Sequence, residues 1–190
     1  MLKQREYPVI FREMIYMRRV HVEPYNPLWA VRFQDEAAQI QKALGPWVLA
    51  IHHMGSTAVP GLAAKPIIDL LVVVSDMTEL TDKLPALKAL GYEFWGEYGI
   101  PNRYFFPKGG DQRTHHLHMV SSESPHIVRH LAFRDYLISH PDEAFAYAKL
   151  KMALAARFPT DIDGYINGKS ATVSAIQQKA LDWYRMKLEE

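Results

Sequence analysis

A single carboxylate interrupts an otherwise apolar stretch of the chain. Residues 67–74 read Ile-Ile-Asp-Leu-Leu-Val-Val-Val, a composition typical of a buried strand, and Asp69 is their one charged side chain. Burying an ionised carboxylate is costly unless a cation or hydrogen-bond donors meet it. Asp69 therefore either has a structural partner or faces a cleft in which it does chemistry.

A glycine–serine pair stands at the end of the preceding apolar run. Twelve residues separate Ser56 from Asp69. Gly55 would let the backbone approach a ligand closely, and a helix starting after it would offer free N–H groups to a phosphate. Asp69 would hold a divalent cation, Mg²⁺ or Mn²⁺ rather than Zn²⁺, that bridges the same phosphates. We therefore expect Asp69 and Ser56 to be the catalytic residues if the protein transfers phosphoryl or nucleotidyl groups.

Histidines on a later strand offer a second possible ligand set. His116 and His118 lie on one face of the expected strand 113–121 because side chains alternate along a strand. If that strand pairs with residues 67–74, Asp69, His116 and His118 form a plausible site for zinc, manganese or iron. The alternative is that the imidazoles bond to neighbours or bind an anion. We expect surface or capping roles for His126, His130 and His140.

Six basic side chains are candidates for binding an anionic ligand. If they converge on one cleft, they would bind phosphate or carboxylate groups, with bidentate geometry from the arginines. Each one taken singly also fits a solvated surface charge or a local salt bridge. The candidates are Lys65, Arg103, Arg113, Arg134, Lys151 and Lys169.

Several long segments resemble a known family. The segments HMGSTAVPGLAAKPIIDLLV, RYFF, HHLHMV, LAFRDYLISHP and YAKLK are similar to the GrpB family, also called UPF0157, over about residues 21–183. The Gly-Ser pair followed by a strand aspartate also resembles the nucleotidyltransferase superfamily, whose pattern is Gly-Ser and then Asp-x-Asp. The resemblance implies a nucleotidyltransferase-like fold more firmly than it implies a reaction.

The chain departs from that pattern at position 71. Leu71 stands where the second carboxylate of Asp-x-Asp would be, on the same strand face as Asp69. Two-metal transfer needs paired carboxylates on that face, so we do not expect a two-metal site. Three functions stay open. They are a divergent nucleotidyltransferase-fold protein that binds a nucleotide or other phosphorylated small molecule, a non-catalytic anion-binding or partner-docking module, and a metal-dependent hydrolase using Asp69, His116 and His118.

The elements that would position these residues indicate an α+β fold. We expect a mixed sheet flanked by helices and a helical C-terminal third. Residues 164–170 look like a phosphate-binding loop but are one residue short, since Asp163 stands where glycine is needed, so we reject a kinase. The expected strands are 47–54, 67–74, 92–96, 103–107 and 113–121, and the expected helices are 27–44, 76–90, 127–139, 142–158 and 170–187.

Composition sets the remaining expectations. A chain of 190 residues is enough for one domain, which we place at 21–190 behind an N-terminal extension of residues 1–20. A net charge of +1 gives no overall attraction to nucleic acid or membrane, so an anion site must come from local clustering. The absence of cysteine suits a reducing cytoplasm. The expected partner is a phosphorylated small molecule or nucleotide, and the oligomeric state is left open.

Overall fold

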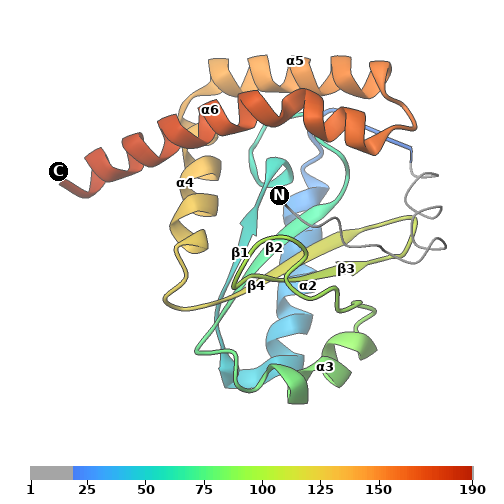
Figure 1. Ribbon diagram of the computed structural model, residues 1–190, viewed down its shortest axis with the longest axis vertical. Helices are drawn as coiled ribbons and strands as arrows, with labels where there is room; N and C mark the ends of the chain where they lie inside the picture. The colour runs from blue at the N-terminus through green and yellow to red at the C-terminus, as the bar shows by residue number, and fades with distance from the viewer. Residues whose placement is uncertain (1–18, 190) are drawn as a thin grey trace, which may run out of the picture.

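A mixed sheet with helices on both faces forms the body of the protein (Figure 1). The structure, a computed structural model, describes residues 19–189, so most of the predicted extension lies outside the described part. The α+β class and the helical C-terminal third are confirmed. The strands are β1 (Val48–Met54), β2 (Ile68–Val74), β3 (Tyr104–Lys108) and β4 (His115–Ser121), and the helices are α2 (Leu28–Leu44), α3 (Leu80–Ala89), α4 (His126–Ser139), α5 (Pro141–Arg157) and α6 (Ile162–Glu189).

The strand order β1-β2-β4-β3 places β2 in the interior of the sheet. Its neighbours are β1, which is antiparallel, and β4, which is parallel. An interior strand with covered faces favours a continuous run of Val, Ile and Leu, which is what surrounds Asp69. The parallel register places Asp69 opposite His116 and Leu71 opposite His118.

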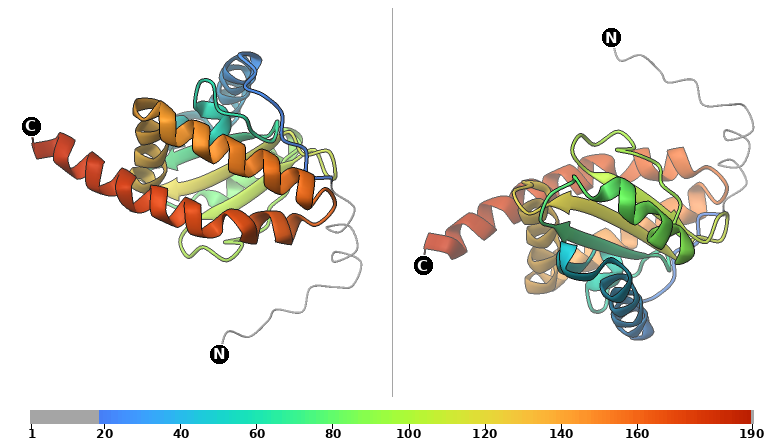
Figure 2. Two further views of the ribbon diagram at one scale, coloured as in Figure 1. Left: turned by 90° about the horizontal axis from the view of Figure 1, so that it is seen from above. Right: turned by 90° about the horizontal axis from the view of Figure 1, so that it is seen from below.

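The two faces of the sheet are covered by different helices (Figure 2). On one face, apolar side chains of α2 and α3, including Trp29, Ile40 and Leu87, pack against Leu70 and Val72 of β2. On the other face, which also carries Asp69, α5 and α6 cross over the sheet. We call this second side the Asp69 face. None of the helices within residues 19–189 is both long and apolar enough to cross a membrane.

Two predicted elements were wrong. Residues 92–96 form no strand; Tyr92 makes an isolated bridge to Lys108, and glycines with φ of +87° and +63° bound the segment at Gly91 and Gly96. The last helix begins at Ile162 instead of residue 170, because the Asp161 carboxylate accepts a hydrogen bond from the Gly164 N–H at 2.8 Å. Residues 164–170, which look like a phosphate-binding loop in the sequence, are therefore part of a helix.

A buried ion pair joins α2 to the sheet on the face opposite Asp69. Glu36 is 4% exposed, and both of its carboxylate oxygens accept hydrogen bonds from Lys108 Nζ at 2.8 Å. His115 Nε2 lies 3.8 Å from the same carboxylate. Because Lys108 keeps 23% of its side chain exposed, water screens part of this attraction.

We expect Glu36→Gln to lower the free energy of unfolding by about 1–3 kcal/mol, since it leaves Lys108 without its counter-charge. The matched control is Glu79→Gln, which breaks an exposed pair with Lys83 and should cost less than about 0.5 kcal/mol. Urea unfolding of both variants measures the difference. Equal losses in the two variants would contradict the assignment of Glu36 as a structural anchor.

Candidate functional site

Asp69 lies on the Asp69 face of the sheet between two histidines of β4. Its Oδ1 accepts a hydrogen bond from His116 Nδ1 at 3.2 Å and lies 3.9 Å from His118 Nε2. The predicted condition for this arrangement, that the two strands pair, is confirmed by the register. The Asp69 side chain is 26% exposed, so this carboxylate is within reach of solvent although the strand around it is buried.

The two histidines hold Asp69 in its ionised form. Burial by itself raises the pKa of Asp69, but hydrogen bonds and charge from His116 and His118 outweigh burial and leave that pKa well below its usual range. The site therefore carries a fixed negative charge throughout the neutral pH range.

Arg103 fixes the protonation of His118. Arg103 Nη1 lies 2.9 Å from His118 Nδ1, and Nη2 donates to the backbone oxygens of Glu97 and Tyr98. A guanidinium can only donate, so Nδ1 accepts and the proton of a neutral His118 lies on Nε2, toward Asp69. Burial is the largest influence on the pKa of His118 and lowers it, which keeps the ring neutral. Arg103, predicted to bind a ligand, instead positions His118 by donating to Nδ1, the ring nitrogen that does not face Asp69.

Gly55 is required by Asp69 itself. Its φ is +71°, and a Cβ atom added there would lie 2.5 Å from Asp69 Oδ2. The prediction that Gly55 makes room for a ligand therefore needs correction, because the carboxylate fills that room. The segment that follows is a 3₁₀ turn of three residues, Ser56–Ala58, and not the start of a long helix. Ser56 lies close enough to Tyr147 on α5 to lower the pKa of the tyrosine hydroxyl, against the larger effect of burial, which raises it.

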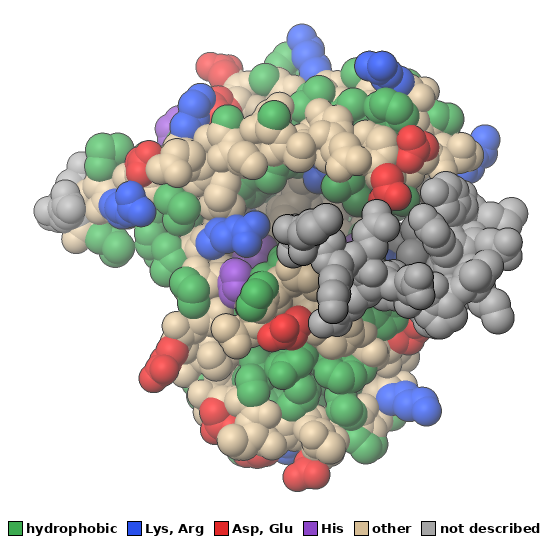
Figure 3. Space-filling view, viewed as in Figure 1, with side chains coloured by type: hydrophobic (Ala, Val, Ile, Leu, Met, Phe, Trp, Pro, Cys, Tyr) green, Lys and Arg blue, Asp and Glu red, His purple; other side chains and the backbone are tan. Residues whose placement is uncertain are grey.

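Three lysines approach the Asp69 face from different elements, and we call them the lysine cluster: Lys65, Lys151 and Lys169. Lys65 lies on the loop before β2, and its Nζ is 5.5 Å from the centroid of the Tyr165 ring. Lys169 of α6 lies 5.8 Å from the same ring. A hollow between α5–α6 and the sheet, with basic and histidine side chains along it, is visible in Figure 3. We call this hollow the cleft.

Lys151 is the most unusual member of the lysine cluster. It is 2% exposed, and its Nζ has no hydrogen-bond partner among the described residues. The ammonium lies 4.5 Å from the Tyr147 ring centroid. Burial, followed by repulsion from Lys169 and Lys65, lowers the pKa of Lys151 to about 7, against the opposing attraction of Asp69. Burying a cation without a partner costs free energy. An anion beside Lys151 would supply the missing counter-charge and hydrogen-bond acceptors.

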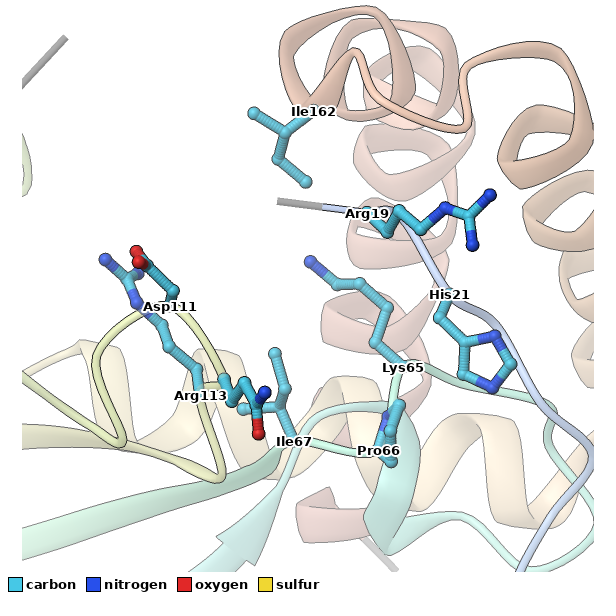
Figure 4. A pocket seen from close by; sticks show the side chains of 9 residues that line it. Arg19, His21, Lys65, Pro66, Ile67, Asp111, Arg113 and Ile162 are labelled. Atoms are coloured by element: carbon cyan, nitrogen blue, oxygen red, sulfur yellow. The ribbon is translucent and has the colours of Figure 1, made fainter. Parts of the chain in front are cut away.

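Lys65 also lines a second pocket next to the cleft (Figure 4). This pocket has a volume of about 150 Å³, and in it Lys65 extends into the space between Arg19 and Ile162. Arg113 lies on another wall and stacks on Trp95, with its guanidinium carbon 4.4 Å from the ring centroid. Arg113 thus lines the pocket beside the cleft and is no part of the lysine cluster.

Arg134 serves the fold and not the cleft. Its Nε donates to Asp135 at 2.7 Å, and Nη1 donates to the backbone oxygen of His53 at 3.0 Å. A local salt bridge was one of the alternatives that the sequence left open for each basic residue, and Arg134 forms one with Asp135. The second bond ties α4 to the end of β1, next to the turn that carries Gly55.

Two residues near the site escaped sequence reasoning. His130, predicted to be a surface or capping residue, faces the site, with its ring centroid 6.0 Å from that of His118, and burial lowers its pKa to about 3. Tyr147 touches both Ser56 and Lys151. Its spacing of four residues from Lys151 on α5 was the available signal, since side chains at that spacing share a helix face.

The family model for GrpB protein matches residues 19–179. The chain belongs to the GrpB family. It is 45% identical over 166 residues to the UPF0157 protein YqkA of Bacillus subtilis (strain 168), an alignment that covers 87% of this chain and 48% of YqkA. The chain thus spans about half the length of that relative.

A solved structure agrees with the assignment to the GrpB family. The crystal structure of GrpB from Enterococcus faecalis matches with a TM-score of 0.83 at 40% identity, covering 86% of this chain and 99% of that one. The Cid1 poly(U) polymerase matches with a TM-score of 0.41 at 12% identity, over 69% of this chain and 44% of Cid1. The second likeness is too slight to assign any residue a role.

The residues of this GrpB chain do not fit a paired-carboxylate metal site. Leu71 is fully buried in an apolar cluster with Met54, Val73 and Val120. His118 does not fit as a ligand either, because a neutral histidine binds a metal through the nitrogen without the proton, and that nitrogen accepts from Arg103. Within residues 19–189, no group of three or more His, Asp or Glu side chains is arranged to hold a metal ion.

We expect Gly55→Ala to destabilise this GrpB chain more than Gly61→Ala. Both glycines have positive φ, at +71° and +79°, but no atom lies within 4 Å of a Cβ built at Gly61. The Gly61 variant should cost about 1–2 kcal/mol from backbone strain alone. The Gly55 variant should cost about 1–2 kcal/mol more, because it must displace Asp69. Urea unfolding compares the two, and equal losses would show that Asp69 does not require the glycine.

Lys151 should give the protein a stability that rises with pH. The unfolded chain holds the Lys151 proton up to a pKa of 10.5, whereas the folded protein releases it at about 7. Between these values unfolding takes up a proton, so raising the pH favours the folded state by at most about 1.4 kcal/mol per pH unit. Lys151→Met should remove this slope and stabilise the unliganded protein at pH 6–7 by about 2 kcal/mol. Urea unfolding at several pH values measures both effects, and identical slopes for the two proteins would refute them.

Proposed function

We propose that this GrpB chain binds a nucleotide or another phosphorylated small molecule, with its phosphate groups held in the cleft by the lysine cluster. The observation that carries the proposal is the Lys151 ammonium, which is buried, has no hydrogen-bond partner in the described part of the chain and is flanked by Lys65 and Lys169. A bound phosphate would supply the acceptor oxygens and negative charge that Lys151 lacks.

The surroundings favour phosphate over an apolar ligand. The Tyr147 ring lies 4.5 Å from Lys151 Nζ, and Ser56 interacts with Tyr147, so two neutral hydroxyl groups accompany the lysine cluster. The overall charge of the chain is only +1, so the positive potential is local to this face and is not a property of the whole molecule. Local convergence of this kind is what specific recognition of a small anion requires.

A second candidate function is a binding module without catalysis. The burial of Leu71 favours it, because the position of the second carboxylate is part of the apolar core and paired-carboxylate metal chemistry has no place there. The two candidates share the same ligand and differ in turnover. A reaction that Asp69→Asn abolishes while ligand binding persists would decide for an enzyme.

The test compares Lys151→Met with Lys149→Met. Lys149 lies on the same helix but is exposed, with its Nζ 4.4 Å from the centroid of the Phe145 ring. Thermal-shift and calorimetric titrations with ATP and with inorganic tripolyphosphate, each with and without Mg²⁺, should show binding by the wild type. Lys151→Met should lose at least about tenfold in affinity, equivalent to 1.4 kcal/mol. Lys149→Met should bind like the wild type.

The combination of results makes the test strict. Lys151→Met should be more stable than the wild type and yet bind more weakly, which separates loss of the ligand contact from loss of folding. If neither compound binds under either condition, or if the two lysine variants behave alike, the proposed function is wrong.

A further inference from the structure

Among the residues that the structure describes, three ammonium groups and one carboxylate act on one another in the cleft, so positive charge exceeds negative charge there. The lysine cluster brings three ammonium groups from a loop and two helices, and Asp69 is the carboxylate that acts on Lys151 and Lys169. The lysines also repel one another, as the lowering of the Lys151 pKa by both neighbours indicates. A ligand that relieves this repulsion must carry several adjacent negative charges.

Asp69 is already committed to protein partners. Its Oδ1 faces both His116 and His118, and its Oδ2 is packed against Gly55. The strand position that would pair with it is Leu71, which is 0% exposed. A divalent cation that entered with a phosphate ligand would therefore find one carboxylate, already hydrogen-bonded to His116, and would be repelled by three ammonium groups.

We propose that the cleft takes a di- or triphosphate group in its metal-free form, with the lysine cluster in place of the usual divalent cation. This inference rests on the proposed function and names the form of its ligand. Each lysine contributes one charge and up to three donors, which together match the oxygens of consecutive phosphates. A lone phosphate brings fewer charges than the cluster, and the Mg²⁺-bound form of a polyphosphate brings a cation that competes with the lysines.

The experiment is a calorimetric titration of the full chain with inorganic tripolyphosphate and with orthophosphate. Metal is removed from the buffer by a chelating resin, because a soluble polycarboxylate chelator would itself be an anion for the cleft. Tripolyphosphate should bind without metal and at least tenfold more tightly than orthophosphate. Excess Mg²⁺ should then weaken tripolyphosphate binding at least fivefold.

Two variants test the same inference from opposite directions. Lys169→Met should weaken metal-free tripolyphosphate binding at least tenfold, with Lys149→Met as the unaffected control. Asp69→Asn keeps an oxygen for His116 but removes the negative charge, so it should leave metal-free binding unchanged or tighter. A metal-ligand role for Asp69 predicts the reverse, a loss of binding in that variant.

The outcomes separate this inference from the proposed function. Binding of tripolyphosphate that requires Mg²⁺ or Mn²⁺, or that either ion tightens, overturns the metal-free inference and leaves phosphate binding in place. Binding that Asp69→Asn abolishes, in a variant whose thermal unfolding is unchanged, overturns it in the same way. Failure of every phosphate compound to bind, with and without metal, overturns both.

Discussion

The contact of the Asp69 carboxylate with His116 is the interaction on which the site depends. The carboxylate is tolerated inside an apolar strand because an imidazole donates to Oδ1 at 3.2 Å and a second imidazole faces the same oxygen. Accommodating this carboxylate places requirements on two other residues. His118 is held in the required tautomer by Arg103, and the turn after β1 must be glycine because Oδ2 fills the space of a side chain.

Much of this frame follows from sequence pattern. The run that carries Asp69 and the alternation of His116 and His118 have local signals, and these two strands lie within one or two residues of their expected bounds. The parallel pairing of β2 with β4 was stated only as a condition, because no local signal encodes which distant strand lies alongside. Its register decides that Asp69 meets a histidine and not a leucine, since a shift of one residue would turn every side chain to the other face.

The cleft side of the C-terminal helices was harder to predict. Sequence reasoning proposed six basic residues as one set. In the structure they differ in the groups that each side chain contacts. Arg103 and Arg134 bond to backbone oxygens and serve the fold. Lys151 differs because it lies in the buried stripe of α5, with Tyr147 and Leu154 also on that stripe. A lysine in the apolar stripe of an amphipathic helix was a signal for a cleft, whereas the sequence around Arg103 and Arg134 gave no comparable sign.

The apolar residue at position 71 and the lysine cluster have a joint physical explanation. With leucine at position 71, the Asp69 face lacks the second carboxylate of a two-metal site, so a phosphate ligand there would need another source of positive charge. Under the proposed function, the three lysines of the cluster supply that positive charge from the loop before β2 and from α5 and α6. Either change alone would work poorly, because a second carboxylate beside the lysines would cancel their charge, and a metal ion among them would be repelled. Within residues 19–189 the buried Lys151 ammonium has no hydrogen-bond partner, and under the proposed function this is a cost of keeping the cleft ready for an anion, since binding sites commonly retain groups that weaken the unliganded fold.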